Sequence, residues 1–207
     1  MRKYFRLIAY VFVIIGVSSA NSDAYVDYFR AVSVDNADTV KELLARGFDP
    51  NTKSETGQVA LFLAMRDDSP KVAAVLLASR ALNVDATNVA GETALMMAAL
   101  KGRTEWAKKL IERGAKVQKP GWSPVHYAAT GPSTELLVML LDRGADINAL
   151  APNRNTPLMM AARYGPEENV KLLLQRGADR KLINDRNLSA ADMARTADRE
   201  ALLPLLQ

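Results

Sequence analysis

Side chains suited to catalysis or metal binding are scarce in this chain of 207 residues. It holds no cysteine and one histidine, His126. A cysteine nucleophile, a thiolate metal site and a site with two histidine ligands are therefore excluded. The nearest approach to a hydrolase nucleophile is Ser123 in Gly121-Trp-Ser-Pro-Val125, which lacks the last glycine of a nucleophile elbow. We expect a protein without enzymatic activity, bound metal or cofactor.

Net charge gives no sign of a nucleic-acid partner. The chain has 27 basic and 23 acidic residues, a balance of +4. Arg2, Lys3 and Arg6 lie in a segment that we expect to be removed, which leaves 24 basic against 23 acidic residues, or +1. A nearly neutral chain has little electrostatic attraction to phosphate backbones or anionic lipids. We expect neither nucleic-acid binding nor stable membrane insertion.

Residues 1–20 have the pattern of a secretory signal peptide. Basic residues precede the apolar run Leu7–Val17, and Ser18-Ser19-Ala20 places small residues before a cut after Ala20. The run is shorter than the roughly 20 residues of a membrane span. The pattern predicts a mature chain of residues 21–207 in the periplasm. An uncleaved N-terminal anchor and release to the outside medium remain alternatives.

A nine-residue motif recurs along the rest of the chain. Its clearest copies are Gly91-Glu-Thr-Ala-Leu-Met-Met-Ala-Ala99, Gly121-Trp-Ser-Pro-Val-His-Tyr-Ala-Ala129 and Arg154-Asn-Thr-Pro-Leu-Met-Met-Ala-Ala162. Weaker copies start at Gly57 and Asn187, so the starts are separated by 34, 30, 33 and 33 residues. Repeats of this length are typical of stacked helical units.

Each copy has the residues that begin and end helices. Thr or Ser at positions 93, 123, 156 and 189 is expected to cap a first helix, and Pro124 and Pro157 suit the first helical position. Second helices are predicted near residues 105–111, 135–141 and 168–174. Glycines 47, 114, 144 and 177 follow Leu-rich segments and are expected to end second helices in the left-handed conformation.

In these motifs the chain resembles the ankyrin repeat family, whose unit of about 33 residues carries Thr-Pro-Leu-His and an alanine pair. The resemblance covers about residues 23–207. It implies an all-α ankyrin-repeat solenoid of about six helix–turn–helix units with projecting loops. It also implies that His126 forms hydrogen bonds between loops and neighbouring repeats. We expect units at about residues 22–50, 51–84, 85–117, 118–147, 148–182 and 183–207.

The family resemblance also implies a protein-binding surface on the loop tips and the exposed face of the first helices. Transferred unit by unit, this surface comprises Gln58, Arg66, Asp67, Glu92, Leu100, Lys101, Trp122, Thr130, Asn155, Arg163 and Tyr164. Trp122 follows a loop three residues shorter than the others, so its ring is expected either at the mouth of the groove or in the space left by the missing hairpin. The paired methionines of the repeats fit either core packing or an adaptable binding surface.

The predicted function is that of a monomeric, non-enzymatic module in the periplasm. It would bind an exported partner protein and modulate or protect it. The alternative is a secreted effector that binds host proteins through the same surface, which would place the chain outside the cell envelope. Fold alone does not decide between them.

Overall fold

The computed structural model describes residues 22–207, and the predicted signal peptide, residues 1–20, lies outside this range. The described chain is helical, and its one β-type pairing is an isolated bridge between Lys53 and Val59. The all-α fold class predicted from the sequence is confirmed. None of the helices in residues 22–207 has the length and apolarity needed to cross a membrane.

The described chain forms two compact units, which comprise residues 22–83 and 84–207. In the first unit, helical residues 22–33 precede α2 (Ala37–Ala45), α3 (Ala60–Asp67) and α4 (Pro70–Ala78). The second unit contains α5 (Ala94–Leu100), α6 (Thr104–Glu112), α7 (Pro124–Thr130), α8 (Thr134–Asp142), α9 (Pro157–Tyr164), α10 (Glu167–Gln175), α11 (Ala190–Arg195), η1 (Glu200–Leu202) and α12 (Leu203–Leu206).

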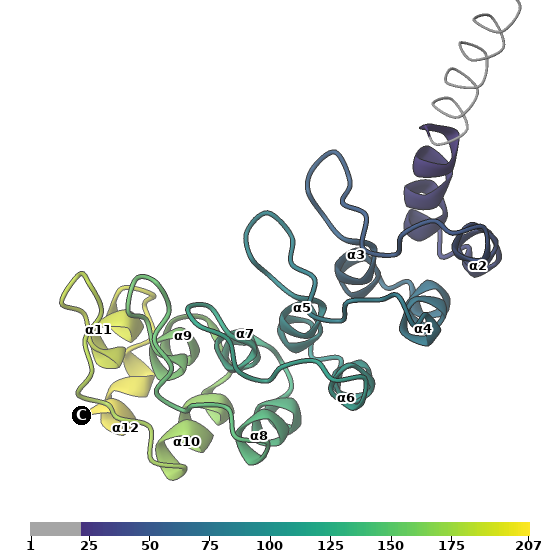
Figure 1. Ribbon diagram of the computed structural model, residues 1–207. Coiled ribbons are helices and arrows are strands. Elements are labelled where there is room, and N and C mark those ends of the chain that lie inside the picture. The colour runs from purple at the N-terminus through teal and green to yellow at the C-terminus, as the bar shows by residue number, and fades with distance from the viewer. Residues whose placement is uncertain (1–21) are drawn as a thin grey trace, which may run out of the picture. The chain divides into compact units, whose positions relative to one another are not determined.

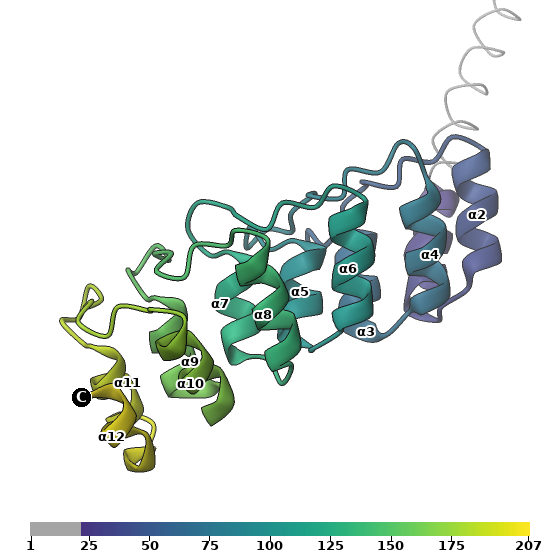
Figure 2. The same ribbon diagram turned by 90° about the horizontal axis from the view of Figure 1, so that it is seen from below.

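Within the second unit the helices form two layers. Helices α5, α7, α9 and α11 pack side by side in one layer, and α6, α8 and α10 form the other (Figure 1). We call the first layer the inner helices. The view from below places α6, α8 and α10 in front of α5, α7 and α9 (Figure 2). Between the layers lies a core of buried leucine, methionine and alanine side chains, among them Leu110, Leu140 and Leu173.

Most of the residues that were predicted to begin or end helices do so in the structure. Thr93, Thr156 and Ser189 each accept a hydrogen bond from a backbone N–H three residues later, and α7 and α9 begin at their prolines. Ser123 differs, because its hydroxyl lies 2.9 Å from Nδ1 of His126. Glycines 47, 114, 144 and 177 all have φ between +88° and +98°, so a left-handed residue ends each of these second helices.

Neighbouring inner helices approach each other closely where glycines follow them. A Cβ on Gly131 would collide with the carbonyl oxygen of Ala99, and a Cβ on Gly165 with that of Ala129. These glycines are therefore required by close packing of the backbone, although their φ values are ordinary for any residue. The absence of a side chain at these glycines allows the C-terminal ends of α5, α7 and α9 to pack closely.

Side chains from the next repeat donate to carbonyl groups at the C-terminal end of an inner helix. The buried Asn169 donates to the carbonyls of Ala128, Ala129 and Gly131 at 3.0–3.2 Å. One repeat later, Arg199 donates to the carbonyls of Ala161 and Ala162. Long-range contacts of this kind fix the register of successive repeats.

The first unit is held by similar contacts among its own helices. The buried Tyr28 donates to the carbonyl of Pro50 at 3.1 Å, and the hydroxyl of Ser69 donates to the carbonyl of Val32 at 3.0 Å. A carboxylate oxygen of Asp35 accepts from the backbone N–H of Val72 at 2.9 Å, at the start of α4. This unit therefore has its own network of buried contacts.

The connection between α6 and α7 is shorter than the others. In the other loops, two backbone hydrogen bonds close a tight turn, as between residues 88 and 92 and between residues 151 and 155. Across residues 22–207, residues 115–122 are the connection from a second to a first helix that lacks this pair. The projecting turn is therefore missing from the loop that is three residues shorter than the others.

Candidate functional site

A hollow of about 380 Å³ lies on the exposed face of the inner helices α5, α7 and α9. We call it the inner-helix hollow. Its lining is mostly apolar and comes from three successive repeats. The lining residues are Leu100, Trp122, His126, Tyr127, Thr130, Met160 and Tyr164. Four of them, Leu100, Trp122, Thr130 and Tyr164, belong to the predicted partner-binding surface.

Aromatic rings form one side of the hollow. The Trp122 ring meets His126 edge to face at 5.3 Å between centroids and Tyr127 at 6.4 Å. It is half-buried and lines the hollow. The Tyr127 hydroxyl donates to Glu92 at 2.6 Å. Burial and this carboxylate raise the pKa of Tyr127, so its hydroxyl stays protonated.

His126 forms the floor of the hollow and is fully buried. Its Nε2 faces the carbonyls of Ala149 and Asn155 at 3.0 and 3.1 Å, and Nδ1 receives the backbone N–H of Ser123 at 3.3 Å. Because Nε2 faces two carbonyl oxygens, which can only accept hydrogen bonds, Nε2 carries the ring proton. Nδ1 is then the ring's hydrogen-bond acceptor. Burial lowers the pKa of His126 and favours this neutral tautomer. The ring joins neighbouring loops, as expected from the family resemblance.

Two cationic residues are next to lining residues of the hollow in the chain. Lys101 directly follows the lining residue Leu100 and is exposed. The guanidinium of Arg163 lies over the Tyr164 ring, 5.2 Å from its centroid, and donates to the hydroxyl of Thr196 at 3.4 Å. Over residues 22–207, neither cation forms an ion pair with a carboxylate of the chain. Their charge therefore remains available to an approaching molecule.

Thr130 lines the hollow and Glu92 contacts the lining residue Tyr127, but the side chains of both already have hydrogen-bond partners. The Thr130 hydroxyl donates to the carbonyl of Tyr127 at 2.9 Å, within α7. The Glu92 carboxylate accepts from Asn88 at 2.8 Å as well as from the Tyr127 hydroxyl. Thr130 therefore contributes surface, and Glu92 holds the Tyr127 ring in place.

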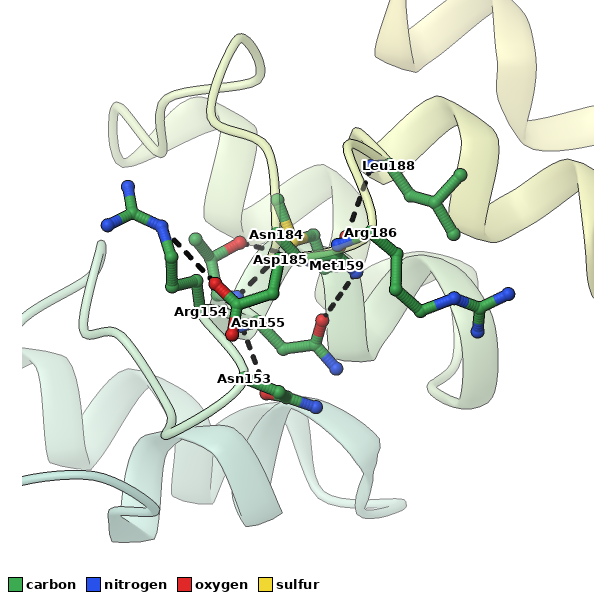
Figure 3. A network of polar contacts seen from close by, with 9 residues as sticks. Asn153, Arg154, Asn155, Met159, Asn184, Asp185, Arg186 and Leu188 are labelled. Atoms are coloured by element: carbon green, nitrogen blue, oxygen red, sulfur yellow. Dashed lines mark hydrogen bonds and ion pairs between the residues drawn. The ribbon is translucent and has the colours of Figure 1, made fainter.

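Asn155 has a different environment from the one expected for a contact residue. Its side chain is 7% exposed, and its Oδ1 accepts from Nδ2 of Asn184 in the next loop at 2.8 Å (Figure 3). Oδ1 of Asn153 accepts from the Asn155 backbone, while Arg154 approaches Asp185 at 3.9 Å. The amide therefore links neighbouring loops, and we leave Asn155 out of the proposed surface.

Three other predicted contact residues belong to the first compact unit. Arg66 and Asp67 form a bidentate ion pair with each other at 2.6 and 2.8 Å. The side-chain amide of Gln58, which is half-buried, donates to the carbonyl of Thr56 at 3.4 Å. The inner-helix hollow contains none of these residues in its lining. Their role in partner binding stays a prediction.

The partner surface inferred from the sequence omitted three residues that line the hollow, His126, Tyr127 and Met160. Tyr127 and Met160 occupy the same position of successive repeats, six residues after the motif start. They lie one helical turn before the predicted positions at the ends of α7 and α9, on the same helix face. Helical spacing combined with the repeat register was the signal that could have found them.

The residues that could support chemistry are not grouped as in a catalytic or metal site. In the described part of the chain, no cluster of three or more histidine, aspartate or glutamate side chains could hold a metal ion. The Ser123 hydroxyl bonds His126, but the ring's other nitrogen faces carbonyl oxygens rather than a carboxylate. This arrangement lacks the third member of a catalytic triad.

Tandem helix pairs joined by loops of similar length define a helical repeat protein. The family model described as ankyrin repeats (3 copies) matches residues 28–120 and 116–184. The chain belongs to the ankyrin repeat family. Ankyrin repeats form protein–protein interaction modules, so the chain is expected to have protein partners.

The chain is similar in sequence to parts of human and mouse proteins. The chain is 31% identical over 159 residues to human transient receptor potential cation channel subfamily A member 1, covering 72% of this chain and 14% of that protein. It is 32% identical over 166 residues to the mouse B-cell lymphoma 3 protein homolog, covering 77% and 37%. The chain thus spans well under half the length of these relatives, and the similarity is confined to part of each.

A solved structure resembles the chain over most of both lengths. It is a chain of the complex between the predatory endopeptidase Bd0816 of Bdellovibrio bacteriovorus and the immunity protein Bd3460. The TM-score is 0.72 with 27% sequence identity, and the match covers 87% of this chain and 96% of that chain.

Proposed function

We propose that this chain is a non-enzymatic module that binds an exported partner protein in the periplasm and modulates or protects it. One observation carries the proposal: residues selected from the sequence as contact positions meet in the inner-helix hollow. Leu100, Trp122, Thr130 and Tyr164 come from three repeats and line one apolar surface. Tryptophan, tyrosine and arginine are the residue types most enriched among energetically important interface contacts.

The similarity to the endopeptidase–immunity protein complex supports an enzyme as the partner. That complex unites an endopeptidase with a protein that gives immunity, and the matched chain is covered almost completely. By analogy, we propose that this chain holds an exported enzyme in check through surface recognition. Its predicted export signal would bring it to the same compartment as that enzyme.

The experiment is a pull-down of the tagged full-length chain from its native cells, with envelope and medium fractions kept separate. The test variant combines Trp122→Ala with Arg163→Ala. The matched control combines Trp106→Ala with Lys109→Ala, which removes a similar ring and cation from α6, where Lys109 Nζ lies 4.5 Å from the Trp106 ring centroid. Circular dichroism verifies that all variants remain helical.

The proposal predicts one dominant envelope partner that the control retains and the test variant loses. Equal recovery with both variants would overturn the assignment of the surface. A partner recovered only from the medium, or from host material, would favour the secreted effector.

A further inference from the structure

We propose that the inner-helix hollow receives one aromatic or large aliphatic side chain of the partner, and that Lys101 and Arg163 recognise an acidic residue beside it. The inference rests on the protein-binding function proposed above and names the chemistry of the bound segment. The hollow would thus be an anchor for an acidic and apolar sequence of the partner.

The lining of the hollow favours an apolar guest. The polar groups around it already have partners: both ring nitrogens of His126 are hydrogen-bonded, and the Tyr127 hydroxyl donates to Glu92. A guest side chain therefore meets carbon atoms of Leu100, Trp122 and Met160, and the buried polar side-chain atoms of the described chain already have partners. The volume of about 380 Å³ is near the lower end of the range, about 300–1,000 Å³, of small-ligand pockets. It suits a single large side chain.

The charges beside the hollow favour an acidic neighbour. Lys101 and Arg163 have no carboxylate partner within residues 22–207, whereas the nearby carboxylate of Glu92 is satisfied by two donors. The excess of positive charge disfavours a cationic guest. Arg163 also occupies one face of the Tyr164 ring, where a ligand cation would otherwise stack.

The exposure of the rim favours a protein segment over a small free ligand. Tyr164 is 59% exposed and Leu100 is 37% exposed, so large apolar surface extends beyond the hollow itself. A small ligand within the hollow would leave this surface in water. A protein segment laid across the ends of α5, α7 and α9 would bury the rim and bring its acidic residue toward the two cations.

Peptide binding to the purified full chain tests the inference without the natural partner. Three dye-labelled peptides share one glycine-rich sequence: the first has a central phenylalanine between aspartates, the second replaces phenylalanine by alanine, and the third replaces the aspartates by lysines. Fluorescence anisotropy should give at least about tenfold weaker binding for the second and third peptides. Added salt should weaken binding of the first peptide, because its flanking contacts are ionic.

Variants assign the effect to the hollow. Tyr164→Ala removes an exposed rim side chain without disturbing the core and should weaken the phenylalanine peptide at least about fivefold. Lys101→Glu combined with Arg163→Glu should reverse the preference, so that the lysine-flanked peptide binds better. Lys109→Glu on α6 is the matched charge control and should leave the preference unchanged.

The outcomes separate this inference from the proposed function. Equal binding of all three peptides, or no binding of any, would overturn the anchor while a pull-down partner could still be retained. Concentration-dependent self-association that Tyr164→Ala abolishes would replace the partner segment by a second copy of the chain. If the unmodified chain bound no peptide and recovered no partner in the pull-down, both proposals would be overturned together.

Discussion

Replacement of Asn169 by alanine should strongly destabilise the second compact unit. Asn169 is fully buried, and its Nδ2 donates to carbonyls at the C-terminal end of α7. Its Oδ1 accepts from the Thr134 hydroxyl at 2.8 Å. Alanine removes these bonds and takes a donor away from buried carbonyl groups at the end of α7, where only the carbonyl of Ala128 also accepts from the backbone N–H of Gly131. The hydrogen bonds of one repeat to the next are lost together.

The magnitude follows from the number of bonds. A hydrogen bond contributes about 0.5–1.5 kcal/mol net, and an unpaired buried polar group costs about 1–3 kcal/mol. Two full bonds from Nδ2 and one to Oδ1 give an expected loss of about 2–4 kcal/mol for Asn169→Ala. Thr134→Val breaks one of these bonds and should cost about 1 kcal/mol. Arg199→Ala, at a half-exposed position with two bonds to α9, should cost about 1 kcal/mol.

Urea unfolding followed by far-ultraviolet circular dichroism measures these losses. We expect the largest loss of unfolding free energy for Asn169→Ala and smaller losses for Thr134→Val and Arg199→Ala. A loss below about 0.5 kcal/mol for Asn169→Ala would refute the view that this side chain joins the repeats. Because α7 also carries Tyr127 and Thr130, peptide binding to the hollow should weaken in the same variant.

Three further results are expected. Gly131→Ala should lower the melting temperature by several degrees, because its methyl group meets the Ala99 carbonyl; an unchanged melting temperature would contradict the close approach. Burial lowers the pKa of His126, so its contribution to stability is complete above about pH 6.5 and is lost as the pH falls through the folded-state value. Urea titrations at several pH values should detect this loss, and His126→Gln should remove the dependence in this window; a dependence that persists in the variant would assign it to other groups. If the predicted signal peptide is cleaved, N-terminal sequencing of the protein isolated from its native cells should begin at Asn21, whereas an intact Met1 would indicate a retained anchor.

The regular part of the fold could be predicted from the sequence because each repeat carries its own start and stop residues. The prolines of α7 and α9 and the left-handed glycines after the second helices stand where the motifs place them. Local chemistry of this kind depends on few neighbours, so it can be read without knowledge of tertiary contacts. Because the same helix-starting and helix-ending residues recur in successive repeats, the sequence also predicts the all-α repeat architecture.

Contacts between repeats could not be predicted in the same way. The motif does not reveal that Asn169 reaches three carbonyls at the C-terminal end of α7, or that Asn155 bonds Asn184 in the next loop. Both are polar side chains whose burial depends on the stacking of the next repeat. That Trp122 and Tyr164 line the same hollow could be predicted in part, because equivalent positions of successive repeats stack on one face of the protein.

Photo-crosslinking in native cells tests the central claim, that the inner-helix hollow is the partner-binding surface, most directly. A photoreactive amino acid replaces Tyr164 at the exposed rim or, as the control, Lys109 on α6. We expect a covalent adduct with one envelope protein from position 164 and none from position 109. Adducts from position 109 alone, or equal adducts from both positions, would contradict the assignment of the partner to the hollow.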